Sequence, residues 1–224
     1  MNFTAFNLTG KDAEKFLQGQ LTNNVTKIAD DFLPTAICNL KGRVAFGLWI
    51  KRIDDGFQLV LASDLADAFK LHIKKYGAFS KITLSELTQI FPFVINHLPS
   101  FSENESDKDW ATFAKQSLEI GNYWLTAETS EQFQPQELRL HQRGGVDYDK
   151  GCYLGQEIVA RLWFKAAPKA WLHRIVLADN LNEKIQIVCQ FDGQALVVAR
   201  PDDLVGVEVL EIGGLVGEVG RSQT

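Results

Sequence analysis

Apolar residues recur at helical spacing in two stretches of the first half of the chain. Positions 13, 16, 17 and 21 lie three or four residues apart, which predicts a short helix with one buried face. The same period over residues 65–76 predicts a second helix. Segments rich in β-branched and aromatic residues predict strands at residues 36–38, 43–52, 57–61 and 82–84. Short turns between them favour antiparallel pairing, so we expect an α+β fold of antiparallel sheets with flanking helices.

Short apolar segments separated by turns return near the carboxyl end and predict strands at residues 172–177, 185–191, 195–198 and 205–210. Strands at this spacing indicate a small C-terminal β-barrel or sandwich. Residues 99–109 are polar and acidic, which is typical of an exposed linker or long loop. We therefore expect three parts: an amino-terminal α+β subdomain at 1–98, a middle segment at 99–165 and a β-barrel-like subdomain at 166–224.

Composition narrows the class of protein. The 224 residues contain 23 Lys plus Arg and 28 Asp plus Glu, a net charge of -5. This balance argues against a broad basic surface, so no direct nucleic acid binding is expected. The amino terminus has no basic segment followed by a long apolar run, and no apolar stretch approaches the roughly 20 residues that span a bilayer. We expect a cytoplasmic protein that does not bind membranes.

The three cysteines are Cys38, Cys152 and Cys189, and they form no CxxC pair and no metal-ligand spacing. Neither a disulfide framework nor a metal site is therefore expected, and a reducing compartment is the natural setting.

The segment KGCYLGQE at residues 150–157, followed by IVAR, is the most unusual stretch of the sequence. Glycine on either side of Cys152 allows the backbone to approach a ligand closely and leaves the thiol accessible. If they lie within a few ångströms of the thiol, Lys150 and Arg161 would favour the thiolate by their charge, whereas Glu157 would oppose it. The commoner role of an isolated cysteine is packing in the core, and residue type alone leaves both roles open.

KGCYLGQE followed by VAR closely resembles the signature of the YgfZ family, folate-binding proteins related in fold to the aminomethyltransferase of the glycine cleavage system. The resemblance extends, in family order, over most of residues 3–165. It includes LTG (8–10), DAEKFLQGQLTN (12–23), CNLKGR (38–43), KKY (74–76), FSK (79–81), EIG (119–121) and QFQPQEL (132–138).

The resemblance implies a GcvT/YgfZ-like fold with a central site for tetrahydrofolate or a derivative, formed where the three parts meet and lying beside the cysteine loop. It also implies partners that are iron–sulfur client or assembly proteins, and a role in synthesis or repair of iron–sulfur enzymes, including one that modifies tRNA. Phe3 and Phe113 lie near positions where the family places aromatic rings against folate, and ordinary core packing is the alternative. The middle segment is shorter than is common in the family.

Cys152 is the candidate reactive residue, with a redox or transient-ligand role. The other candidate residues belong to its motif loop: Lys150, Gly151, Tyr153, Gly155, Gln156, Glu157 and Arg161. We expect an accessory protein that is not an enzyme in the usual sense. The alternatives are a folate-dependent aminomethyltransferase-type one-carbon transferase and a protein-interaction scaffold that does not bind folate.

Overall fold

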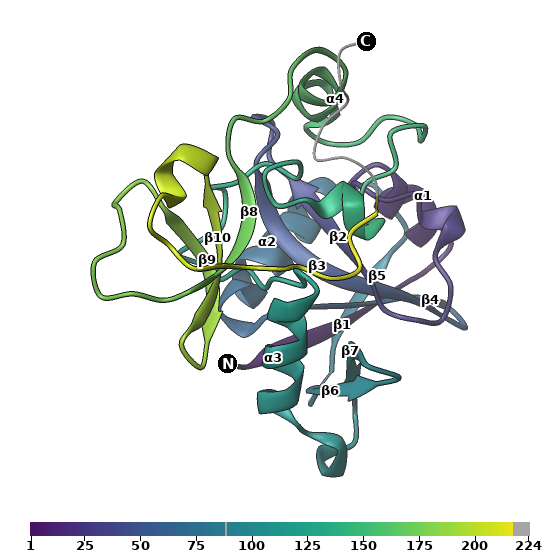
Figure 1. Cartoon of the computed structure of the whole chain (residues 1–224). Helices are drawn as coiled ribbons and strands as arrows, with labels where there is room; N and C mark the ends of the chain where they lie inside the picture. Colours follow the sequence, from purple (N-terminus) through teal and green to yellow (C-terminus); the bar gives the residue numbers. More distant parts are fainter. Residues whose placement is uncertain (88, 217–224) are drawn as a thin grey trace.

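The computed structural model describes residues 1–87 and 89–216, and its largest sheet lies in the amino-terminal part (Figure 1). This five-stranded sheet is antiparallel throughout, with strand order β2-β3-β4-β1-β5. Its strands are β1 (Phe3–Thr9), β2 (Leu33–Cys38), β3 (Val44–Ile53), β4 (Gly56–Ala62) and β5 (Thr83–Glu86). The strands expected around residues 36–38, 43–52, 57–61 and 82–84 are confirmed, and β1 is an additional central strand.

Both faces of this sheet are buried because successive side chains of a strand point to opposite sides. Phe6 of β1 packs against Phe69, with ring centroids 5.2 Å apart, in the core that the sheet forms with α1 (Ala13–Gln18) and α2 (Ala66–Tyr76). Phe3 faces the core on the other side. The two helices expected from the apolar spacing therefore cover one face of the sheet, and the rest of the chain covers the other.

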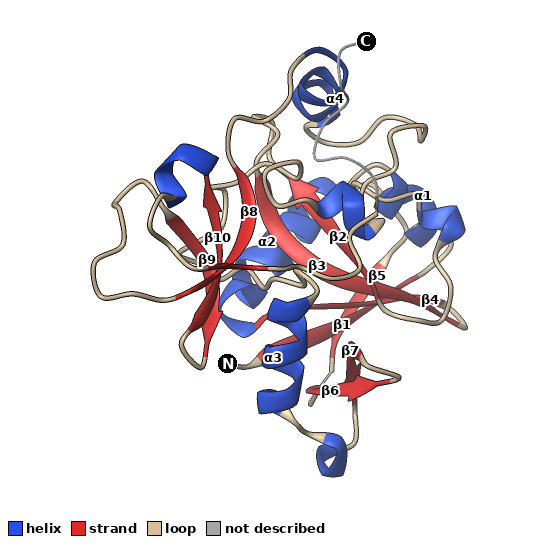
Figure 2. Ribbon diagram, viewed as in Figure 1, coloured by secondary structure: helices blue, strands red, loops and turns tan. Residues whose placement is uncertain are grey.

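The second face is covered by the middle and carboxyl-terminal parts of the chain (Figure 2). A hairpin of β6 and β7 and the helix α3 contact each other, and α3 also contacts β9 and β10. The remaining helices and strands are β6 (Phe91–Ile95), β7 (Leu98–Ser102), α3 (Trp110–Glu119), α4 (Gln156–Lys165), β8 (Trp171–Val176), β9 (Gln186–Phe191), β10 (Gln194–Ala199) and β11 (Val209–Leu210). Single 3₁₀ turns are η1 (Val25–Lys27), η2 (Ser63–Leu65), η3 (Glu105–Asp107), η4 (Leu140–Arg143) and η5 (Pro201–Leu204).

The prediction of an exposed linker at residues 99–109 is wrong for residues 99–102. Residues 99–102 belong to β7, and Phe101 is buried, with its ring centroid 5.0 Å from that of Phe3 and 5.3 Å from that of Phe113. The aromatic side chain of Phe101 therefore buries this part of the polar run against the core, next to Phe113 of α3. The polar residues that follow form the exposed η3 turn.

The carboxyl-terminal sheet has the order β11-β8-β10-β9 and is antiparallel. Its edge strands, β11 and β9, do not pair with each other within the described residues, so the expected sheet is present without closure into a barrel there. The strand expected at 205–210 is reduced to β11 because residues 205–207 form a turn, in which the backbone nitrogen of Val207 donates to the oxygen of Leu204. The end of the segment expected at 166–224 lies outside the described residues, from 217 onward.

One hydrophobic cluster joins residues of the amino-terminal sheet, α3 and the carboxyl-terminal sheet, from Phe3 to Val198. The three parts of the chain therefore share a core, and the boundaries at 98 and 165 stay predictions. Across residues 1–87 and 89–216, no helix is both long enough and apolar enough to cross a membrane.

Candidate functional site

The motif loop, residues 150–155, is fixed to the end of helix α1 by the buried side chain of Lys150. Its Nζ donates hydrogen bonds to the backbone oxygens of Gln18 and Leu21, at 2.7 and 2.6 Å. The last carbonyls of a helix have no intrahelical donor, so the ammonium caps α1. Burial lowers the pKa of Lys150 to about 8, and the charge of Asp147 opposes this shift.

Two further contacts hold the same loop. The backbone nitrogen of Leu154 donates to the oxygen of Gly19 at 3.1 Å. The ring of Tyr153 is buried, with its centroid 4.8 Å from the Lys150 Nζ, and burial raises the pKa of this tyrosine. The loop therefore docks on the helix end by backbone, cationic and aromatic contacts together.

Gly155 is required where the loop enters α4. Its φ of +79° lies in the left-handed region, and a Cβ added there would lie 2.3 Å from the backbone oxygen of Asn39 and 3.1 Å from Cβ of Cys38. In contrast, a Cβ added at Gly151 would meet nothing within 4 Å. The turn after β2 thus lies directly against the motif loop, which brings together two of the segments that carry the family resemblance.

Of the three cysteines, Cys152 alone is exposed. Cys38 and Cys189 are buried, and burial raises the pKa of each thiol to about 12. An attacking oxidant, metal ion or partner in solvent therefore meets a single thiol, on a loop whose backbone is held at both ends.

The other motif residues lie around the start of α4. Gln156 opens the helix, and its backbone nitrogen donates to the oxygen of Tyr153 at 3.1 Å. Glu157 is exposed in the first turn, where a negative charge suits the helix dipole. Arg161 is exposed one turn later. Within the described chain neither Glu157 nor Arg161 forms an ion pair with the loop.

A second set of polar side chains lies buried where β3, the segment after α3 and β9 meet. We call Asn122, Tyr123 and Arg143 the central polar cluster. Asn122 Oδ1 accepts from Trp49 Nε1 at 2.9 Å and from an Arg143 guanidinium nitrogen at 2.5 Å. The Tyr123 hydroxyl is buried and has no hydrogen-bond partner among the residues that the structure describes.

Arg143 is a partly buried cation. Burial lowers the pKa of its guanidinium to about 10, and the groups that oppose this shift are Tyr123 and Cys189. No carboxylate of the described residues pairs with it. At neutral pH the arginine stays charged, and a buried charge with no partner is strongly unfavourable. The cluster is therefore suited to an anionic ligand.

Arg139, four residues before Arg143, is also partly buried and also forms no ion pair with the described residues. Its backbone is left-handed, with φ of 52°, and burial lowers its pKa. Its charge helps to lower the pKa of His173. Within the described part of the chain, the buried Nε of Arg139 and the buried Nε2 of His173 have no hydrogen-bond partner. No sequence motif identified Arg139 and Arg143 as site residues. The one sequence feature that could have pointed to them is their spacing of four residues beside Leu138 and Leu140, both of which are buried in the structure.

Phe3 and Phe113 lie together in the aromatic part of the core, with centroids 5.6 Å apart. They are 7% and 0% exposed. Phe3 also borders a small pocket of about 200 Å³ beside Trp110. Both rings pack against other core rings, and contact with folate stays a prediction for them. In the part of the chain that the structure describes, no group of three or more His, Cys, Asp or Glu side chains is arranged to hold a metal ion.

No protein-family model matches the chain. Among curated proteins, a tRNA-modifying protein YgfZ from Escherichia coli O157:H7 (strain EC4115 / EHEC) is 30% identical and covers 74% of this chain and 67% of the relative. A protein of the same name from Cronobacter sakazakii (strain ATCC BAA-894) is 28% identical, covering 72% of this chain and 65% of the relative. The chain thus spans about two thirds of the length of these relatives.

The fold is similar to that of a solved aminomethyltransferase. The crystal structure of glycine cleavage system aminomethyltransferase T from Bartonella henselae matches with a TM-score of 0.60, covering 88% of this chain and 76% of the other. The two sequences are 13% identical. This similarity confirms the expected GcvT-like fold.

Proposed function

Because this chain belongs to the YgfZ family, we propose that it is a folate-binding accessory protein for synthesis or repair of iron–sulfur enzymes, a tRNA-modifying enzyme among them. The relatives carry the name tRNA-modifying protein. The observation that carries the proposal is the single exposed thiol of Cys152 on a loop clamped to α1 by Lys150.

The thiol of Cys152 is the reactive group, as a transient ligand for iron or in redox exchange. One cysteine supplies one of the ligands that a cluster needs, so the remaining ligands come from the client protein. This division suits a helper that acts on a cluster held elsewhere. We also propose a cytoplasmic location, because a reducing compartment keeps an exposed, unpaired thiol free.

We also propose that the central polar cluster binds the anionic tail of folate. Guanidinium groups form strong charge-assisted hydrogen bonds with carboxylates, and Arg143 lacks such a partner among residues 1–87 and 89–216. The unpartnered hydroxyl of Tyr123 offers a donor and an acceptor to a ligand in the same place. When bound, tetrahydrofolate supplies a carrier for one-carbon units.

The fold also occurs in an aminomethyltransferase, which makes one-carbon transfer the second candidate. Transfer to a folate nitrogen requires a positioned general base or carboxylate. The accessory role is the better supported of the two, because the curated relatives are named tRNA-modifying protein YgfZ and the aminomethyltransferase shares only the fold at 13% identity.

The first test is complementation of a strain that lacks this protein, with activity of its tRNA-modifying iron–sulfur enzyme as the readout. We expect Cys152→Ser to keep the wild-type melting temperature and to lose the supporting function. Gly151→Ala is the matched control in the same loop, because its new methyl group enters open space. Full rescue by Cys152→Ser would overturn the proposal.

Calorimetry tests the folate site. We expect tetrahydrofolate to bind at least about tenfold more tightly than tetrahydropteroate, which lacks the glutamate, because one charge-assisted hydrogen bond contributes about 1.5–3 kcal/mol. Arg143→Met should remove this preference. Equal affinities in the wild-type protein would contradict tail recognition, and no heat at millimolar tetrahydrofolate would leave the scaffold without folate as the better interpretation.

A further inference from the structure

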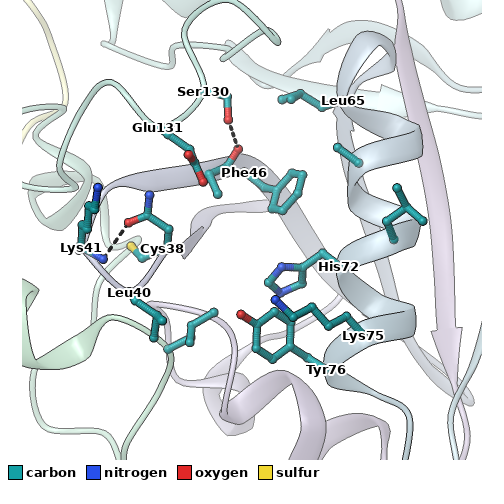
Figure 3. A pocket seen from close by; sticks show the side chains of 15 residues that line it. Cys38, Leu40, Lys41, Phe46, Leu65, His72, Lys75, Tyr76, Ser130 and Glu131 are labelled. Atoms are coloured by element: carbon teal, nitrogen blue, oxygen red, sulfur yellow. Dashed lines mark hydrogen bonds between the residues drawn. The ribbon is translucent and has the colours of Figure 1, made fainter.

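A pocket of about 620 Å³ lies on the outer side of the amino-terminal part, between helix α2 and the turn that follows β2 (Figure 3). Ser130 and Glu131 close one end of it, and Leu154 of the motif loop forms part of its wall. None of the central polar cluster lines this pocket. It is therefore separate from the anion site proposed above, although it borders the same loop.

The pocket combines a buried floor with an exposed apolar rim. Phe46 and Leu65 are buried at its floor, whereas Leu40 and Leu71 at the rim are 74% and 67% exposed. A volume of this size holds a small molecule, but a ligand on the floor would leave both rim leucines in water. A protein segment lying across the rim would bury them, and exposed apolar patches of this kind mark protein contacts.

The charged residues at the mouth of the pocket indicate which residues a bound protein segment would carry. Lys41 and Lys75 both line the pocket, and within the described chain neither ammonium has an ion-pair partner. The Lys75 Nζ lies 5.0 Å from the centroid of the Tyr76 ring, on the α2 side of the pocket (Figure 3). Glu131 is the single acidic lining residue. In a chain of net charge -5, this local excess of positive charge favours acidic residues on the partner.

The wall on the α2 side is firmly held. The His72 ring lies 4.5 Å from that of Tyr76 and 5.4 Å from that of Phe46, and its Nε2 is 2.8 Å from Gln20 Oε1. Gln20 lies between the two residues whose carbonyls Lys150 caps. The pocket wall and the anchor of the cysteine loop thus share one segment, so that a partner in the pocket has a fixed position relative to that loop.

We propose that this pocket receives an amphipathic helix of an iron–sulfur client protein, with apolar side chains entering between Leu40 and Leu71 and acidic side chains facing Lys41 and Lys75. The inference rests on the proposed function, for which it names the docking surface. Because Leu154 is two residues from Cys152, docking here holds the client beside the exposed thiol.

The test uses the full chain with benzoylphenylalanine in place of Leu71 and the purified tRNA-modifying iron–sulfur enzyme of the same organism. We expect photocrosslinking to a client peptide with apolar and acidic residues, and a loss of about tenfold or more in yield with Lys41→Glu and Lys75→Glu, as for residues at the centre of an interface. The matched control carries the photoreactive residue at Val205, which is 85% exposed and does not line the pocket. Crosslinking to a second copy of the chain, no crosslinking, or a yield unaffected by charge reversal would each overturn the docking surface.

A second variant separates this inference from the function on which it rests. Leu71→Asp changes an exposed position of α2 and should keep the melting temperature and tetrahydrofolate binding, while losing support of the client enzyme in the complementing strain. Full support by Leu71→Asp, together with none by Cys152→Ser, would overturn the docking surface and leave the proposed function in place. Full support by Cys152→Ser would remove the proposed function itself.

Discussion

Lys150 places a positive charge in the interior, and among residues 1–87 and 89–216 no carboxylate forms an ion pair with it. Its ammonium donates to the backbone carbonyls of Gln18, the last residue of α1, and of Leu21, three residues further on, near the negative end of the helix dipole. The sequence suggested that this lysine acts on the Cys152 thiol. In the structure, the Lys150 ammonium binds carbonyl oxygens at the end of α1. Lys150 therefore affects Cys152 by fixing the position of the loop.

Lys150→Met should therefore lower the free energy of unfolding by about 1–3 kcal/mol, because two buried carbonyls lose their donor. The rate of Cys152 alkylation should also change as the loop leaves α1. Urea unfolding and reaction with iodoacetamide measure the two effects. Lys169→Met, at an exposed lysine, is the control and should change neither quantity. An unchanged stability of Lys150→Met would contradict a clamping role.

Among the elements, those that follow local apolar patterns were the most predictable. The two helices over the first sheet and strands β2 to β4 follow from periods visible in the sequence. Strand β1, the hairpin β6–β7 and helix α3 were missed, because their burial depends on distant partners, as Phe101 shows against Phe3 and Phe113.

The candidate site likewise divides into residues that a local sequence motif identifies and residues that only the tertiary fold brings together. The contiguous motif singled out Cys152 and its loop, and the structure then decides between the two roles left open by showing that the thiol is exposed. The central polar cluster could not, since it forms only when Asn122, Arg143 and Cys189 meet through the tertiary fold. Contacts across such sequence distances leave no periodic signal in the chain.

The junction between the motif loop and α4 depends on the absence of a side chain at Gly155. Gly155→Ala should destabilise the protein by about 1–3 kcal/mol, because a left-handed backbone conformation and a clash with the Asn39 carbonyl act together. Gly151→Ala should stay within about 0.5 kcal/mol of wild type. Thermal or urea unfolding of the pair checks this, and equal stabilities of the two variants would refute the close approach.

For the whole molecule, histidines in two distant parts resist protonation in the same way. Burial lowers the pKa of His72 in α2 and of His173 in β8, each to about 4. Below the ordinary histidine pKa of about 6.5, the unfolded chain binds protons that the folded chain does not. These two residues therefore reduce stability progressively as the pH falls from 6.5 to about 4.

We expect a lower free energy of unfolding at pH 5 than at pH 7, measured by urea titration. The difference should be smaller in His72→Gln than in the wild-type protein, because one of the two groups is removed. His97→Asn, at an exposed position in the β6–β7 turn, should leave the difference as it is. The same pH dependence in His72→Gln and wild type would exclude His72 as a source of acid sensitivity.

The burial of Cys38 and Cys189 also limits what oxidation can do to this protein. Cys152 has no accessible thiol of its own chain with which to condense while the fold is intact. A sulfenic acid formed there is consequently resolved by a thiol from a second molecule, or proceeds to irreversible acids. While the fold is intact, any disulfide formed by Cys152 therefore joins this protein to a second molecule.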